Sequence, residues 1–175
     1  VRYAEALAAV GRQGEAVTAA RAAWTGGALT PDDEARLLGR FRASSTPADN
    51  DARMDRLLWD RATAAAARQL PLVSPARAGL FAARLALQTN APDAAERVAA
   101  LGAAADADPG LVVDRARWLR DRAQGVEARA LLARQRRFTA PPLDAGAWLT
   151  TYFTIAQQAE HDNQATLAFD IASQA

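Results

Sequence analysis

The chain has 175 residues, of which 47 are Ala and 21 are Arg, and it contains neither Lys nor Cys. Without Cys it has no disulfides, thiolate metal sites or cysteine nucleophiles, and without Lys it has no phosphate-binding G-x-x-x-x-G-K-[ST] loop and no Schiff-base chemistry. The formal net charge is +1, without the basic arm or acidic tail that typically marks binding to nucleic acid or to a membrane surface. No apolar run approaches the ~20 residues of a membrane-spanning helix.

Alanine is the best helix former and is depleted in strands, so this composition predicts an all-α fold. The spacing predicts a helix over residues 3–10, a Gly-containing break at 11–14 and a second helix over 15–24, because Gly tolerates the left-handed conformation that ends helices. The run Thr-Pro-Asp-Asp-Glu at 30–34 predicts the start of a third helix, which ends in the polar segment 44–47.

Four further helical hairpins follow this third helix, and they span residues 51–70, 75–105, 111–134 and 145–175. Turn centres recur roughly every 30 to 48 residues, which is the period of helical-pair repeats. Because each hairpin of such an array buries its apolar face on the next, we predict an irregular right-handed, tetratricopeptide-like α-solenoid. This superhelix is expected to span residues 1–175 as a single domain with at least ten helices and no sheet. The helical pattern runs from one end of the chain to the other, so we expect a piece of a longer protein.

Motifs that carry known chemistry are missing from the chain. None of the six Glu precedes Ser, and neither G-x-S-x-G nor H-E-x-x-H occurs. Glu160 and His161 fall in a polar turn and are expected to be solvated, whereas Asp106 and Asp108 lie at a helix entry, where acids cap helices. We therefore expect no catalytic residue, no metal site and no cofactor.

Two groups of side chains remain as binding candidates. The first is the four tryptophans, Trp24, Trp59, Trp118 and Trp148. A bulky residue that fills gaps in an Ala-rich core is the favoured interpretation of each, over a ring that stacks on sugar. For Trp118 this predicts a loss of roughly 3–5 kcal/mol on replacement by Ala.

The second group is the basic stretch 114–137, which has eight Arg against three acidic residues. Arg134, Arg136 and Arg137 are its candidate substrate-binding residues, for an anionic polymer, and a solvated face is the alternative. No aromatic ladder accompanies them, so nucleic acid is not expected as the partner.

Three segments are more specific than the rest of the chain. They are Arg53-Met-Asp-Arg-Leu-Leu-Trp-Asp-Arg-Ala-Thr-Ala-Ala-Ala-Ala-Arg-Gln-Leu70, Ala82-Ala-Arg-Leu-Ala-Leu-Gln88 and Asp108-Pro-Gly-Leu-Val-Val-Asp-Arg-Ala-Arg-Trp-Leu-Arg120. In this order they resemble the N-terminal superhelical domain of soluble lytic murein transglycosylases. The hairpin that begins near Trp148 looks like a later repeat of the same family, so the resemblance covers about residues 47–175.

The resemblance implies a periplasmic protein whose U-shaped helical domain surrounds peptidoglycan. In this family a separate C-terminal domain cleaves the MurNAc–GlcNAc bond to a 1,6-anhydro product, using Glu-Ser and Gly-Leu-Met-Gln motifs. Neither motif is present, since the one Met is Met54 in Arg-Met-Asp, and Val113 stands where the family more often has Tyr. The implied role is a non-catalytic scaffold that guides glycan strands. The alternatives are a helical-repeat module that binds a partner protein in its concave groove, or an enzyme with an unfamiliar site.

Overall fold

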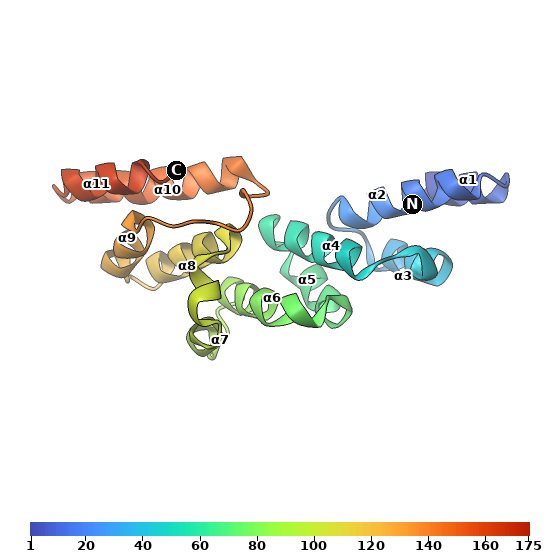
Figure 1. Cartoon of the computed structure of the whole chain (residues 1–175), viewed down its shortest axis with the longest axis horizontal. Helices are drawn as coiled ribbons and strands as arrows, with labels where there is room; N and C mark the ends of the chain where they lie inside the picture. The colour runs from blue at the N-terminus through green and yellow to red at the C-terminus, as the bar shows by residue number, and fades with distance from the viewer. The chain divides into compact units, whose positions relative to one another are not determined.

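The computed structural model describes all 175 residues of the chain. It contains eleven α-helices and three short 3-10 helices, joined by turns and loops, and no strand (Figure 1). The prediction of an all-α fold with at least ten helices is confirmed. The α-helices are α1 Arg2–Ala9, α2 Gln13–Thr25, α3 Pro31–Phe41, α4 Pro47–Trp59, α5 Thr63–Gln69, α6 Pro75–Gln88, α7 Ala94–Ala100, α8 Pro109–Asp121, α9 Gly125–Ala133, α10 Ala145–His161 and α11 Ala165–Ala172. The 3-10 helices are η1 Arg42–Ser44, η2 Leu70–Leu72 and η3 Gly102–Asp106. The chain forms two compact units, unit 1 Val1–Phe81 and unit 2 Ala82–Ala175.

Short polar side chains begin four of these helices. The Thr30 hydroxyl accepts a hydrogen bond from the third residue of α3, and Asp108 and Asp144 cap α8 and α10 in the same way. Thr46 and Asp49 form a reciprocal capping box, in which each side chain accepts from the other's backbone N–H, at 3.2 and 2.9 Å. Because of this box, α4 begins at residue 47, four residues before the predicted start of that hairpin.

The five hairpins share one backbone turn. The first helix of each ends at a residue in the left-handed conformation, with φ between 53° and 77°. These residues are Gly11, Arg61, Asn90, Ala123 and Asn163. The N–H of the next residue donates to the carbonyl five residues back, as from Arg12 to Leu7 at 2.9 Å and from Gln164 to Ala159 at 2.8 Å. This is the Schellman motif, which satisfies carbonyls that a helix end otherwise leaves unpaired.

Small side chains let the helices approach each other closely after these turns. The cores of both units are rich in alanine, and Ala16, Ala66, Ala94 and Ala128 are almost fully buried. Three of the four tryptophans, Trp24, Trp59 and Trp148, are about 5–6% exposed, as expected for residues that fill gaps between alanines. In unit 2, α10 and α11 lie side by side at the red end of Figure 1.

Each unit also buries an arginine that a carboxylate neutralises. In unit 1 the guanidinium of Arg53 donates to the carbonyls of Trp24 and Gly27 and to Glu34, at 2.7–2.8 Å. In unit 2 the Nε of Arg84 donates to Asp114 at 2.8 Å. An unpaired charge in either place is costly, so each buried arginine needs its carboxylate partner. Since the two partners come from helices that are far apart in the chain, each ion pair also joins those helices.

The Asp-Pro-Gly run at residues 108–110 begins the third of the segments that resemble the transglycosylase domain. Local structure explains each of its three residues. Asp108 caps α8, and Pro109 occupies the first helical position, where no N–H is needed. The guanidinium of Arg84 lies over Gly110 so closely that a Cβ there overlaps its atoms. Glycine therefore makes room for the buried Arg84–Asp114 pair.

Candidate functional site

Unit 2 contains a cleft of about 350 Å³, a volume within the usual range of small-ligand sites. It lies between α7, η3 and α8, and we call it the α7–α8 cleft. Its lining residues are Leu87, Ala95, Val98, Ala99, Gly102, Ala105, Asp106, Arg115, Trp118, Leu119 and Gln124. Most of these residues are apolar, but polar and apolar atoms contribute almost equally to the exposed wall, and an indole and two charged groups are its distinctive chemistry.

Trp118 differs from the other three tryptophans. It is only partly buried, at the edge of the core around Leu111, and it borders the cleft. The guanidinium of the exposed Arg122 lies 4.8 Å from the centre of its ring. The indole N–H of Trp118 is buried without an acceptor, whereas that of Trp24 donates to Asn50 at 3.0 Å. Trp118 was expected to be a core residue. It packs on the core with only part of its side chain, because the rest faces the cleft.

Arg115 is the unpaired cation of the cleft. It is half-buried, lines the cleft and has no carboxylate partner. It also lies three residues before Trp118 on α8, a spacing that puts two side chains on one helix face. Arg122 lies four residues after Trp118 and shares this face by the same rule, so spacing in the sequence does not by itself distinguish Arg115 from the other arginines of the basic stretch.

At the edge of the cleft, the Asp106 carboxylate accepts hydrogen bonds from two of the three arginines that were predicted to bind substrate. Arg134 donates to its carboxylate at 2.9 Å, and the Nε of Arg136 donates at 3.4 Å. The segment after α9 is held against the end of η3, since the Thr139 N–H donates to the Ala107 carbonyl at 3.0 Å. Asp106 is therefore an ion-pair partner and not the helix cap that its position suggested.

The three predicted arginines have different surroundings. Only 4% of the Arg136 side chain is exposed, so this residue helps to hold Asp106 in place. Arg134 is more exposed and reaches the same carboxylate, while Arg137 is exposed and has no ion pair. The structure brings Arg134 and Arg136 together on Asp106, although neither arginine lines the cleft itself, and it leaves Arg137 apart. That any of the three binds substrate stays a prediction.

The pKa values of two buried carboxyl groups, Glu34 and Asp114, are shifted from their ordinary values. Neither group is suited to transfer a proton to a substrate. Burial raises the pKa of the Glu34 carboxyl, but hydrogen bonds and attraction from Arg68 and Arg53 more than offset this and hold the pKa below its ordinary value. Glu34 is therefore kept ionised. Burial also raises the pKa of Asp114, with Arg84 opposing it, but Asp114 is 4% exposed and packed inside unit 2.

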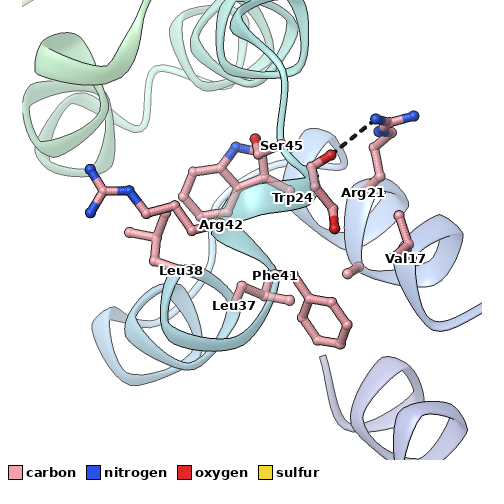
Figure 2. Close-up of a pocket in the computed structure, with 10 residues that line it drawn as sticks. Val17, Arg21, Trp24, Leu37, Leu38, Phe41, Arg42 and Ser45 are labelled. Atoms are coloured by element: carbon pink, nitrogen blue, oxygen red, sulfur yellow. Dashed lines mark hydrogen bonds between the residues drawn. The ribbon is translucent and has the colours of Figure 1, made fainter. Parts of the chain in front are cut away.

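A second pocket lies in unit 1 beneath η1 (Figure 2). Residues of α2 and α3, among them Val17, Trp24, Leu37 and Phe41, form its apolar wall. Its internal space is about 20 Å³, enough for about one water molecule. The Arg21 guanidinium donates to the Ser44 carbonyl at 3.0 Å and closes one side (Figure 2). This pocket is a packing gap of the core.

The turn that contains Glu160 and His161 was predicted to be solvated. It contributes to a third, more open pocket of about 310 Å³ in unit 2. His161 lies in its wall beside Asp162, which pairs with Arg129 of α9 at 2.5 Å. Glu160 and His161 are both exposed, as expected. The Arg129–Asp162 pair ties α9 to the turn between α10 and α11, so these charges serve the packing of unit 2.

No family model, curated protein or solved structure matches the chain. No group of three or more His, Asp or Glu side chains is arranged to hold a metal ion. None of the eleven helices has both the length and the apolar character that crossing a membrane requires. The α7–α8 cleft is the candidate site because its wall contains both the partly buried Trp118 and the unpaired Arg115.

Proposed function

We propose that the chain is a non-catalytic superhelical scaffold from a periplasmic lytic murein transglycosylase, and that it guides glycan strands for a separate catalytic domain. The observation that carries this proposal is the α7–α8 cleft, which combines a partly exposed indole with an unpaired cation. Sugars are bound in this way, because their apolar ring faces stack on aromatic rings and their hydroxyls pair with charged side chains.

The repeated hairpin turn supports the proposed architecture. Five helical pairs that end their first helix with the same Schellman turn are what an irregular right-handed α-solenoid is built from. The segments that resemble the transglycosylase domain include the second halves of α4 and α6 and nearly all of α5 and α8. Their charged residues include Arg53, Arg84 and Asp114, which join helices inside each unit, as befits a scaffold.

Glycan binding is tested with purified sacculi and soluble glycan fragments. We expect the chain to sediment with sacculi and to bind fragments with GlcNAc–MurNAc repeats in calorimetry. Trp118→Ala is expected to abolish binding, and Leu149→Ala, which changes an exposed apolar residue of α10 outside the cleft, is the matched control. Retention of full binding by Trp118→Ala contradicts the role given to the cleft. Release of 1,6-anhydro products by the chain alone contradicts its non-catalytic nature.

A helical-repeat interaction module is the second candidate function. Large apolar side chains are exposed on α9, α10 and α11, namely Val126, Leu149, Phe153 and Phe169. Phe153 is 48% and Phe169 72% exposed, and exposed apolar patches are typical of protein interfaces. Replacing both with Ser is expected to abolish binding of such a partner while leaving sacculus binding unchanged. Loss of sacculus binding in this variant contradicts the assignment of glycan to the cleft.

A further inference from the structure

One side of the α10–α11 hairpin is apolar and exposed. On α10, Leu149, Phe153 and Glu160 follow one another at intervals of four and seven residues, which puts them on one side of the helix. On α11, Phe169 is 72% exposed, and Ile171 is the one buried residue of the helix. Because α10 packs on α8 and α9, and α11 packs on α9, the exposed sides of both point away from the α8–α9 hairpin. We call this surface the α10–α11 face.

Negative charge accompanies the apolar side chains of this face. Residues 138–175 contain four acidic residues and no arginine. Two of the four are used within unit 2, one as the cap of α10 and one in the ion pair with Arg129. The other two, Glu160 and Asp170, are exposed and have no partner in the chain. A surface that covers the α10–α11 face therefore has to be apolar and to carry positive charge.

A surface with these properties lies on α1 in unit 1. Ala4 and Leu7 anchor α1 in the core, and the opposite side of the helix is exposed. This side, which we call the α1 face, consists of Arg2, Tyr3, Ala6, Ala9 and Val10. Its two large apolar residues are 67% and 71% exposed. Both carboxylates of the α1–α2 hairpin already have arginine partners, whereas Arg2 has none, so the free charge of the α1 face is positive.

We propose that the α10–α11 face of one copy of the chain binds the α1 face of a second copy. This inference rests on the second candidate function, the interaction module, and is independent of glycan binding by the α7–α8 cleft. The two faces match in apolar character and have opposite charge, whereas two α10–α11 faces repel each other. The contact is therefore head-to-tail, and each copy in a pair keeps one free face to which a further copy can bind.

The strength of the contact follows from its size. A single helix face that packs on two others belongs to the small class of interfaces, which are weak. We expect a dissociation constant of about 10–100 µM. The apolar side chains supply most of the affinity, because exposed ion pairs contribute little, while the opposite charges select the orientation of the helices.

The test measures the mass of the full chain by analytical ultracentrifugation between about 10 and 500 µM, a range that spans the expected dissociation constant. We expect the average mass of the wild type to rise with concentration beyond that of a dimer. The variant Tyr3→Ser/Val10→Ser removes one face and Phe153→Ser/Phe169→Ser the other, and each alone is expected to remain a monomer. Their equimolar mixture is expected to form a dimer and nothing larger, because each variant keeps one intact face.

Two matched controls separate this contact from general stickiness. Val126→Ser changes a valine that is as exposed as Val10, 71% in both, but lies on neither face, and it is expected to associate as the wild type does. Arg2→Glu is expected to weaken association about three- to tenfold, whereas Arg40→Glu, at an exposed position of α3, leaves it unchanged. All variants change exposed residues and are expected to melt at the wild-type temperature.

Three results overturn the inference. The first is a wild-type chain that stays monomeric over the whole range, which leaves an interaction module with another partner standing. The second is a mixture of the two double variants that forms no dimer, and the third is equal weakening by Arg2→Glu and Arg40→Glu. Sacculus binding is measured on the same proteins, and its absence from the wild type refutes glycan binding without affecting self-association.

Discussion

Replacing Gly110 by Ala tests whether the Asp-Pro-Gly run is there to accommodate a buried charge. A Cβ at this position overlaps the guanidinium of Arg84, so this group has to move. The side chains of Arg84 and Asp114 are 1% and 3% exposed, and their N–O distance is 2.8 Å. Displacement therefore separates two charges that have no access to water.

The expected loss follows from two opposing effects. Breaking a buried ion pair costs roughly 3–5 kcal/mol. Alanine recovers about 1 kcal/mol relative to glycine within a helix. The Gly110→Ala variant is therefore expected to lose about 2–4 kcal/mol in the free energy of unfolding, which lowers the melting temperature of a unit of this size by on the order of 10–25 °C.

Thermal and urea unfolding, followed by circular dichroism, measure this loss. Gly125→Ala is the matched control, since it also lies near a helix start in unit 2 and its added Cβ meets no atom within 4 Å. The control is expected to melt at or slightly above the wild-type temperature. In an Arg84→Met background, Gly110→Ala is expected to cost little. A Gly110→Ala protein as stable as the wild type, or the same loss in both backgrounds, would refute the reasoning.

Three further predictions concern other parts of the chain. Ala123 adopts φ 60° at the end of α8, so Ala123→Gly is expected to raise the free energy of unfolding by about 0.5–1 kcal/mol, and a lower melting temperature contradicts this. Since the folded-state pKa of Glu34 is lowered, its contribution to stability is complete above the unfolded-state pKa and is lost as the pH falls through the folded-state pKa. Acid unfolding of wild type and Glu34→Gln, compared between pH 2 and 6, should therefore show a steeper loss in the wild type. Trp118 is only partly buried, so Trp118→Ala is expected to cost about 1–3 kcal/mol, less than Trp59→Ala in parallel melts.

The sequence by itself determined the helices and where most of them end. Alanine content excluded a sheet, and the signals at the turns are local, because an N-cap hydroxyl, a first-turn proline and a left-handed residue each act within one helical turn. Thr30 and Asp108 cap the helices that their positions predicted. The exception is the start of α4, where Thr46 lies in the segment 44–47 that was predicted to be a polar break and forms a capping box with Asp49.

Only the tertiary structure decided which side chains meet. Asp106 lies 28 and 30 residues from the arginines that bind it, and no helical periodicity relates residues so far apart. The four tryptophans have similar Ala- and Leu-rich neighbours in sequence, yet Trp118 alone is only partly buried, at the edge of the α7–α8 cleft. A helix pattern defines which face is apolar, but the helices packed against that face determine how much of it is covered, and their positions depend on long-range contacts that local sequence does not encode.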